Sequence, residues 1–504
     1  MATIPESSFR VNRNGQTAGR ENAQTVEMAA PPDADAGTFT ALDDSKVTRF
    51  QYKIMFISGM GFFTDAYDLF IIGVVVVILK AQWTLSTGQV SLLNSATLAA
   101  SAVGAIIFGR VADILGRKKI YGFEVLILAI GALASALSPN YIVLLISRVV
   151  LGIGIGGDYP VSATIMSEYS AKRSRGRMVG LVFAMQGAGL VAGPLIAVIL
   201  LATHVPMDVI WRILLGLGAI PGLAVFYLRR QIHETPRFAH AGGDPDEAKA
   251  AIGAATGGAT VRGRKPASKA RQKQTALEGF TTLARNPRML VWLVGTAGAW
   301  ALLDFAYYGN TISSPEVLKV INPHGSLLQN TLLQLVIFVV FALPGYALAI
   351  RLLDSTGRKT IQCFGFTLMA VAFLLIGLVP GVTITVAPFV ILFGASYFFT
   401  EFGPNTTTFV YPAEIFPVDV RTTAHGISAA TGKLGAFAGA YLFPDMLASS
   451  WGLRGAEIVA GVVCLLGLGL SVWLLPEPKG LSLEQLEQSA VAGRPSGKLT
   501  PAVL

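Results

Sequence analysis

Long apolar segments recur along the chain, and short polar or charged segments separate them. A helix needs about 20 mainly apolar residues to cross the hydrocarbon core of a bilayer. The pattern therefore predicts transmembrane helices, with a polar segment from residue 230 to residue 287 between the sixth and the seventh. The predicted helices are Phe50–Leu79, Val90–Gly109, Ile120–Leu137, Ile142–Met166, Met178–Leu201, Val209–Tyr227, Met289–Tyr308, Leu327–Leu353, Ile361–Val379, Ile384–Tyr411, Thr422–Leu447 and Gly455–Leu475.

The composition supports this interpretation. Hydrophobic residues make up 53% of the 504 residues and charged residues only 14%, whereas a soluble domain carries about 25% charged residues. The chain has too little charge to cover a water-soluble globule, which excludes an ordinary soluble, fibrous or disordered protein. We therefore expect an all-α polytopic membrane protein with 12 transmembrane helices.

The polar segments divide the chain into regions. Residues 1–48 are polar and lack the apolar core of a signal peptide, so they are predicted to form a disordered cytoplasmic tail. A six-helix bundle is expected over residues 49–229, a central loop over 230–287, a second six-helix bundle over 288–476 and a C-terminal tail over 477–504.

Basic residues are unevenly distributed between the two sets of loops. One set holds 24 of the 39 Lys and Arg residues, and the opposite set holds 4. Because positive charge stays on the cytoplasmic side, we expect both termini in the cytoplasm, in a plasma (inner) membrane. The basic central loop allows a nucleic-acid or lipid-headgroup patch, but a solvated linker is favoured and no nucleic-acid partner is expected. The sequence leaves the oligomeric state open.

Two sequence motifs repeat between the halves. GRVADILGRKK at residues 109–119 is echoed by DSTGRK at residues 354–359, and Asp113 and Arg117 share an offset of 241 with Asp354 and Arg358. Other acidic and basic pairs repeat at offsets of 239 and 246. This indicates two parallel six-helix repeats related by a pseudo-twofold axis along the membrane normal. The first motif resembles the signature loop of the major facilitator superfamily, and we expect Asp113 and Arg117 to form a cytoplasmic latch.

Several ionisable residues fall within the predicted spans. A charge at this depth is costly and indicates function. Six acids against two bases leave a formal charge of −4, which predicts that some acids exchange protons. We expect Glu124 and Arg148, on neighbouring helices, to form a structural pair. The residues are Asp65, Asp68, Glu124, Asp158, Asp304, Glu401, Arg148 and Lys433.

Other polar residues suggest a cavity. Asp65 and Asp68 are three apart on one helix face and should titrate as a coupled pair, as a proton relay requires. Trp300, Asp304 and Tyr308 form a stripe on the seventh helix. Such a stripe usually packs in a core, but the central carboxylate favours a cavity.

Three more polar side chains lie among apolar residues, namely Gln186, Asn405 and Tyr159. The two amides either bind substrate or join helices. The glycine-rich segment before Tyr159 does not indicate a nucleotide loop, because no strand precedes it. Its glycines are expected to permit close helix packing.

These segments carry a family resemblance. GFFTDAYDLF (61–70), GGDYPVSAT (156–164), FAMQG (183–187), WALLDFAYY (300–308), FGPNTTTF (402–409) and AHGISAATGK (424–433) resemble the phosphate:proton symporters of plants and fungi. The resemblance implies a major facilitator fold and a phosphate site formed by Tyr159, Gln186, Trp300, Asp304, Tyr308 and Asn405. It also implies a proton route through Asp65, Asp68 and Asp158, with Glu124, Arg148 and Lys433 in support. Glu401 departs from the family, which usually has Asn there.

The expected function is import of inorganic phosphate with protons, by rocking of the two bundles. Protonated Asp304 donates a hydrogen bond to dihydrogen phosphate without repelling it, so proton and anion should bind cooperatively. The alternatives are a symporter of an organophosphate or an organic or aromatic acid, and a transporter-like nutrient receptor. An enzyme is not expected, and neither is a cofactor or metal, since the five histidines have no metal-ligand spacing.

Overall fold

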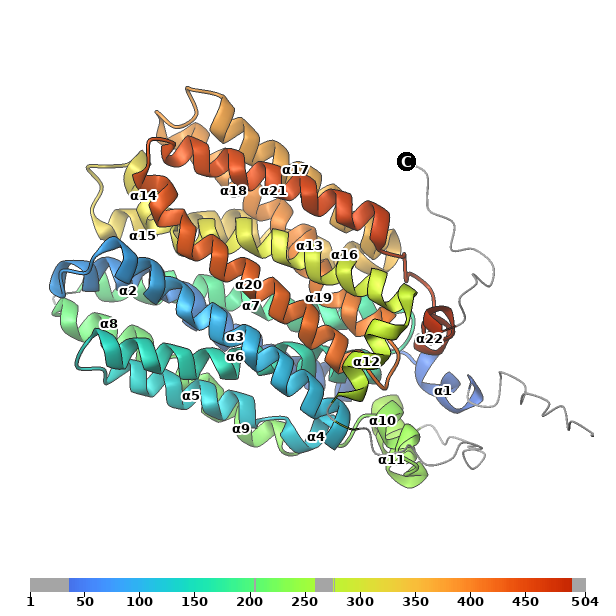
Figure 1. Cartoon of the computed structure of the whole chain (residues 1–504). Helices are drawn as coiled ribbons and strands as arrows, with labels where there is room; N and C mark the ends of the chain where they lie inside the picture. The colour runs from blue at the N-terminus through green and yellow to red at the C-terminus, as the bar shows by residue number, and fades with distance from the viewer. Residues whose placement is uncertain (1–35, 204, 259–274, 276, 492–504) are drawn as a thin grey trace, which may run out of the picture.

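The computed structural model describes residues 36–203, 205–258, 275 and 277–491, and this part of the chain is helical, with no strand (Figure 1). The first half contains α1 (Ala36–Asp43), α2 (Arg49–Gln82), α3 (Thr87–Leu115), α4 (Arg117–Ile120), α5 (Phe123–Ala136), α6 (Tyr141–Tyr169), α7 (Arg175–Leu201), α8 (Met207–Gly216) and α9 (Ala219–Arg229). Three short helices follow: α10 (Pro236–Ala241), α11 (Pro245–Thr256) and α12 (Glu278–Arg285).

The second half contains α13 (Pro287–Ile312), α14 (Ser314–Ile321), α15 (Leu327–Ile337), the π-helical turn η1 (Phe338–Ala342), α16 (Leu343–Thr356), α17 (Arg358–Leu378), α18 (Val386–Phe402), α19 (Pro404–Ile415), α20 (Arg421–Ala448), α21 (Gly452–Leu474) and α22 (Leu483–Val491). Eleven segments of the described residues are long and apolar enough to cross a membrane. The twelfth is α20, whose 28 residues include buried His425 and Lys433 and which packs between α3 and α13. Eleven of the twelve expected spans meet this criterion, and α20 corresponds to the remaining predicted helix, Thr422–Leu447, so the expectation of an all-helical membrane protein is confirmed for the described residues.

The helices form two bundles that lie side by side (Figure 1). The repeat read from the sequence appears in their geometry. Arg117 lies 3.0 Å from Asp113 and 3.3 Å from Glu168 in the first bundle. In the second, Arg358 lies 3.0 Å from Asp354 and 2.8 Å from Glu414. Each arginine follows a glycine at positive φ, 99° before Arg117 and 108° before Arg358, so the turn itself is repeated.

The tenth predicted helix is not continuous. It was expected over Ile384–Tyr411, but α18 ends at Phe402 and α19 begins at Pro404. A Cβ on Gly403 would lie 2.4 Å from Cα of Gly365 on α17, so the backbones approach more closely than a side chain would permit. The break places Asn405 in the first turn of α19, directly after the end of α18.

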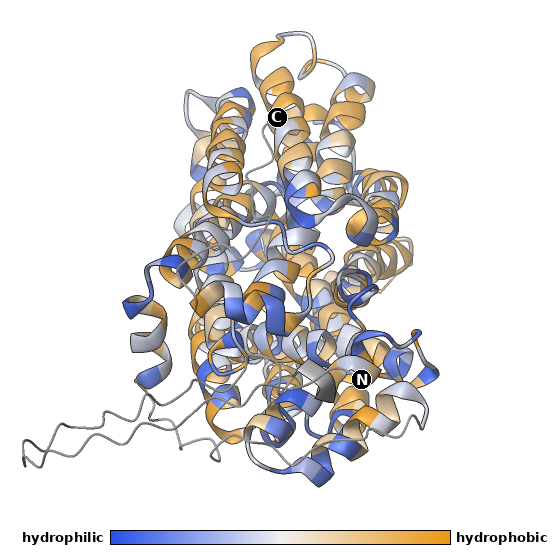
Figure 2. Ribbon diagram, turned by 90° about the vertical axis from the view of Figure 1, so that its right-hand side faces the viewer, coloured by the Kyte–Doolittle hydropathy of each residue, from blue (hydrophilic) through white to orange (hydrophobic). Residues whose placement is uncertain are grey.

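Five short helices lie together at one end of the bundles: α1, α10, α11, α12 and α22 (Figure 1). We call this the basic end, since two basic segments also lie there: 110–119, at the end of α3 and in α4, and 172–177, at the start of α7. Viewed from that side, hydrophilic residues face the viewer (Figure 2).

The short helices modify the predicted tails. Residues 36–43, expected within a disordered tail, form α1, in which Leu42 is buried. Residues 1–35 and 492–504 and most of the basic cluster of the central loop (259–274) lie outside the described residues.

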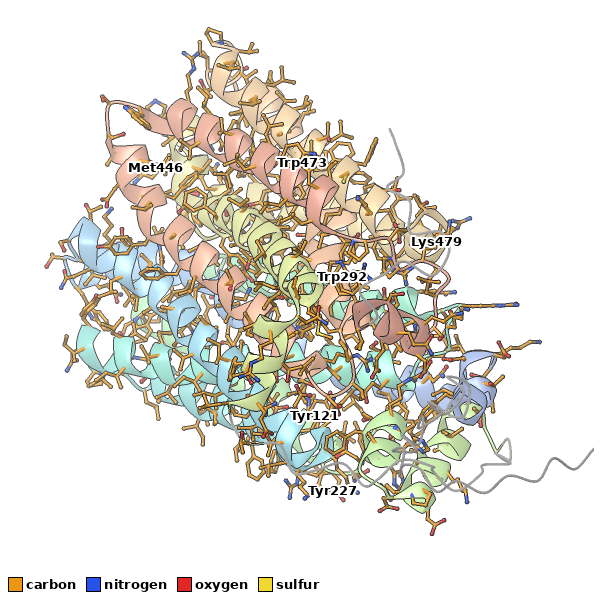
Figure 3. The ribbon with its side chains drawn as sticks, turned by 45° about the vertical axis from the view of Figure 1, so that its right-hand side comes forward. Tyr121, Tyr227, Trp292, Met446, Trp473 and Lys479 are labelled. Carbon is orange, nitrogen blue, oxygen red and sulfur yellow. The ribbon has the colours of Figure 1, made fainter. Side chains whose placement is uncertain are left out.

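The outer faces of the bundles are apolar. Trp473 on α21 is 80% exposed and Tyr227 on α9 is 69% exposed, and both lie on the periphery (Figure 3). A soluble protein of this size would cover such side chains, so these faces fit contact with lipid.

Candidate functional site

The centre of the molecule contains a buried ion pair. Lys433 of α20 donates from Nζ to Asp304 Oδ2 at 3.1 Å and to the Tyr308 hydroxyl at 2.8 Å. Asp304 and Tyr308 are one turn apart on α13. All three side chains are at most 1% exposed. The stripe on the seventh helix, which was expected to line a cavity, faces the buried Lys433 side chain.

The same lysine reaches the first bundle. Its Nζ lies 4.3 Å from the ring centroid of Tyr308 and 4.5 Å from that of Tyr159 on α6. Trp300 lies beside Tyr159, with ring centroids 6.0 Å apart. A cation over aromatic faces is electrostatically stabilised. Tyr159, Trp300, Asp304 and Tyr308 are thus brought together at the interface between the bundles, as the resemblance implied.

A second polar group lies on the other side of an aromatic cluster. Phe183 of α7 has its ring centroid 6.5 Å from that of Tyr159 and 6.4 Å from that of Tyr346 on α16. Asn405 donates from Nδ2 to the Tyr346 hydroxyl at 3.1 Å and to Glu401 Oε2 at 2.5 Å. Tyr346 is a further candidate site residue, which the sequence analysis missed because its segment shows no polar pattern.

Gln186 lies near this second group. Its neighbour Gly187 packs so closely on Tyr346 that a Cβ there would meet the ring at 2.8 Å. Gln186 Oε1 is buried and accepts no hydrogen bond. It is a free acceptor for a protonated ligand. The six candidate phosphate-binding side chains are at most 2% exposed, so the site is closed to solvent.

The predicted pairing of Glu124 with Arg148 is wrong. Arg148 donates instead from Nη2 to the backbone carbonyl of Asp68 at 2.6 Å. Glu124 is paired with Arg229, whose Nη1 lies 2.8 Å from its Oε1. Arg229 also donates to both oxygens of Asp158, at 2.7 and 2.9 Å.

Arg229 is therefore the principal residue that sequence reasoning missed. It is the last residue of α9 and lies two residues beyond the predicted helix Val209–Tyr227, so it is absent from the ionisable residues expected within the spans. The structure buries it completely, against Gly61 of α2. Buried Glu457 on α21 was also missed. One added base and one added acid leave the formal charge at −4.

The two acids of α2 form no ion pair within the described residues, although Arg148, bound to the backbone carbonyl of Asp68, lies near the Asp68 side chain. Asp65 and Asp68 are at most 1% exposed, and their carboxylate oxygens accept no hydrogen bond within the described residues. Asp68 faces Gly218, where a Cβ would lie 2.3 Å from Oδ1. Unpaired ionised carboxylates are costly in such a place, which fits groups that hold and release protons.

Comparison with known proteins identifies the family. Residues 50–490 match the family model described as sugar (and other) transporter. Inorganic phosphate transporter 1-4 of Arabidopsis thaliana is 35% identical, over 88% of this chain and 94% of that relative. Low affinity inorganic phosphate transporter 1 of Petunia hybrida is 34% identical, over 93% and 99%.

The chain belongs to the inorganic phosphate transporter family, within the sugar (and other) transporters. A solved structure of a proton:xylose symporter of the major facilitator superfamily, bound to 6-bromo-6-deoxy-D-glucose, superposes with a TM-score of 0.72 at 20% identity. The superposition covers 87% of this chain and 98% of that one. The expected major facilitator fold is confirmed, and the protein is a transporter and not an enzyme.

At the basic end, hydrogen bonds and an ion pair between the two bundles close the transporter. Asp113 of the first bundle accepts hydrogen bonds from the backbone N–H and the hydroxyl of Thr423 in the second, both at 2.6 Å. Arg421 of the second bundle lies 2.9 Å from Glu168 of the first. Arg117 donates to the carbonyl of Val418 at 3.0 Å. These buried contacts cross between bundles, so the basic end cannot open until they break.

The opposite end of the transporter is closed differently. Phe70 of α2 stacks on Tyr308 of α13, with ring centroids 5.3 Å apart. Above it, Lys80 and Glu316 lie 3.9 Å apart and are partly exposed, which makes this ion pair weak. The site is closed at both ends, and fewer polar contacts between the bundles are described at the end away from the basic loops.

Proposed function

We propose that this transporter imports inorganic phosphate together with protons, by alternating access. Support comes from the names of its relatives, which are inorganic phosphate transporters. The observation that carries the proposal is the buried Lys433–Asp304 pair at the interface between the bundles. In this pair the Lys433 ammonium group can bind an anion, and the Asp304 carboxylate can release the ammonium group when it takes up a proton.

The chemistry follows from this pair. In the occluded structure the Lys433 ammonium group donates a hydrogen bond to the Asp304 carboxylate and is therefore not available to an anion. Protonation of Asp304 removes its charge, so the ammonium group becomes available to dihydrogen phosphate. The hydroxyls of Tyr159 and Tyr308 and the Trp300 indole can donate to the phosphate oxygens, while Gln186 can accept from a phosphate hydroxyl. Proton and phosphate therefore promote each other's binding.

The proposed proton route starts on the first bundle. Asp65 and Asp68 are buried without ion pairs, and Asp158 lies on α6 beside Tyr159. Arg229 and Glu124 hold Asp158 in place. We assign proton exchange to Asp65 and Asp68, and a positioning role to the Arg229 pair.

The basic end is proposed to be cytoplasmic. The positive-inside rule places the arginine-rich loops there. The helices nearest the two termini, α1 and α22, lie at the same end, so both termini would be cytoplasmic in a plasma (inner) membrane. In this orientation Asp113 and Arg117 belong to the cytoplasmic gate, and Phe70 with Tyr308 closes the outer side.

The cation in the site affects the choice of substrate. A carboxylate substrate would be expected to use a fixed cation, and buried Lys433 is such a cation. Site charge alone therefore does not separate phosphate from an organic acid or organophosphate. The relatives favour phosphate, and only a competition measurement decides between these anions.

The experiment uses purified protein in liposomes with labelled phosphate and an imposed inward proton gradient. We expect accumulation that an uncoupler abolishes and that excess sulfate or organic acids do not suppress. Suppression by an organic anion at lower concentration than phosphate would assign that anion as substrate. Phosphate binding without any flux would favour the nutrient receptor.

A further inference from the structure

The buried carboxyl groups inside the bundles form two classes. Three lie in ion pairs with a buried base: Glu124 and Asp158 with Arg229, and Asp304 with Lys433. Four others make no ion pair within the described residues, namely Asp65, Asp68, Glu401 and Glu457. Only Glu401, of these four, is hydrogen-bonded to a candidate phosphate ligand, Asn405.

Glu401 is enclosed at the end of α18. Its side chain has no solvent exposure, Oε2 accepts from Asn405 Nδ2 at 2.5 Å, and Oε1 accepts no hydrogen bond. The Cβ of Glu401 would lie only 3.1 Å from a Cβ on Gly345, so α16 packs directly against it. The carboxyl group cannot turn away to solvent.

No base lies within ion-pair distance of this group among the described residues. The titratable groups that face it are the phenols of Tyr346 on α16 and Tyr307 on α13, and the carboxyl of Asp304 on α13. Helix α19 contributes the neutral amide of Asn405, and η1 and α15 carry no charged residue. The charged residues of α16, α17 and α19 belong to the basic end: Arg351, Asp354, Arg358, Lys359 and Glu414.

An anion bound to Asn405 would therefore lie beside Glu401, which has no ion-pair partner of its own among the described residues. Ionised Glu401 would repel dihydrogen phosphate and would hold the Asn405 amide N–H away from it. Protonated Glu401 is neutral and frees the amide to donate to phosphate. Binding of phosphate and binding of a proton to Glu401 are thus linked in the same direction.

We propose that Glu401 carries one proton with each phosphate, in addition to the proton assigned to Asp304. The inference rests on the proposed phosphate import and deepens it. The proton reaches Glu401 from the outer side as phosphate enters, and leaves to the cytoplasm when phosphate leaves. Two protons accompany one singly charged phosphate, so each cycle moves one net positive charge inward and membrane voltage drives uptake.

The test compares the protein with Glu401→Gln, which keeps the shape and stays neutral. In liposomes, an outward phosphate gradient is opposed by a set pH and voltage until flux is zero. We expect the ratio of protons to phosphate at zero flux to fall from two to one in the variant. We also expect its uptake to lose the response to voltage. An unchanged ratio would overturn the proposal.

A second measurement is used if Glu401→Gln binds phosphate but does not transport it. Phosphate affinity is measured on purified protein at several pH values. Phosphate speciation is the same for both proteins, so a difference in slope belongs to Glu401. At pH values where Glu401 is ionised in the free protein, the phosphate affinity of the parent protein should fall about tenfold more per pH unit than that of Glu401→Gln, because one more proton is bound with phosphate. Equal slopes would refute the role of Glu401.

The matched control is Glu457→Gln. Glu457 is equally buried and forms no ion pair within the described residues; its Oε2 accepts from the Asn310 amide at 3.5 Å, and no hydrogen bond joins it to Asn405. It should leave both the zero-flux ratio and the pH slope unchanged. An equal loss in this variant would refute a specific role of Glu401. Failure of the parent protein to bind phosphate would instead overturn the proposed function itself.

Discussion

Arg229 holds Asp158 by two parallel hydrogen bonds, from Nη1 to Oδ1 at 2.7 Å and from Nη2 to Oδ2 at 2.9 Å. Both side chains have no solvent exposure, and Arg229 Nη1 also donates a hydrogen bond to Glu124 Oε1. This bidentate geometry fixes the position of α6, and with it Tyr159, relative to α9 and α2. The first bundle therefore presents its side of the site through an ion pair that lies outside the site.

Removal of this arginine should destabilise the first bundle. Arg229→Ala leaves two buried carboxylates without a base, at a cost of about 3–5 kcal/mol. We expect a large drop in melting temperature in detergent and loss of uptake. Arg229→Lys restores the charge but not the paired geometry, so it should recover only part of the stability.

The neighbouring Arg230 is the matched control. It is exposed at the end of the same helix and stacks over Phe123. Arg230→Ala should shift the melting temperature little. Equal melting temperatures for the two alanine variants would contradict the importance of the buried pair.

Neutralisation of the coupling carboxylate should separate exchange from accumulation. Asp304→Asn leaves Lys433 without its counter-ion and removes the group that gives up the proton. Phosphate accumulation driven by a proton gradient should fall strongly, because Glu401 then carries the only coupled proton, while phosphate exchange across liposomes at equal pH should persist. Full accumulation by this variant would refute the assignment of Asp304.

The fold could be predicted from the sequence largely because apolar length and charge distribution act locally. The twelve spans and the paired Arg117 and Arg358 motifs follow from the residues themselves. The break at Gly403 could not be predicted, because it depends on where Gly365 of another helix lies.

The candidate site was predicted only in part, for a similar reason. Tyr159, Asp304 and Tyr308 were found because their polarity stands out within apolar segments, and the structure brings them to Lys433. The partner of Glu124 was assigned wrongly. A sequence shows charges that lie within long apolar segments, but not that the packing of α9 buries Arg229, beyond such a segment, within 3 Å of Glu124.

The gate at the basic end should open when Asp113, which is hydrogen-bonded to Thr423 of the other bundle, is neutralised. Asp113→Asn removes the charge that accepts both hydrogen bonds of Thr423 across the bundles. We expect a larger fraction of molecules open at the basic end, since charge-assisted hydrogen bonds are worth roughly 1.5–3 kcal/mol each.

Spin labels report this opening. They are placed at exposed Lys119 and Ser355, on opposite bundles, after replacement of Cys363 and Cys464. The distance distribution should shift to longer values in Asp113→Asn. Asp208→Asn, at the opposite end, should leave the distribution unchanged. An unaltered distribution in Asp113→Asn would exclude Asp113 from the gate.

Acid should release α22 from the basic end. Arg237 of α10 lies 2.9 Å from Glu484 of α22 and 3.0 Å from Asp43 of α1, so one guanidinium joins three short helices. Burial opposes ionisation of Glu484, but the Arg237 charge and hydrogen bond outweigh it and lower the pKa of Glu484 to about 2. Because the pKa of Glu484 is lower in the folded protein than in the unfolded chain, its ionised form stabilises the docked helix at pH values above 4.5. This stabilisation is lost as the pH falls from 4.5 toward 2.

The stabilisation at stake is on the order of 3 kcal/mol, the equivalent of that pKa shift. Hydrogen exchange of α22 should therefore accelerate between about pH 4.5 and pH 2, relative to the exchange of α21 at the same pH. Glu484→Gln should show fast exchange of α22 already at pH 7 and little further change on acidification. Glu487→Gln, on the same helix, should retain the slow exchange at pH 7. Slow exchange of α22 in Glu484→Gln would show that apolar contacts of Leu483 and Leu486, and not the ion pair, hold the helix in place.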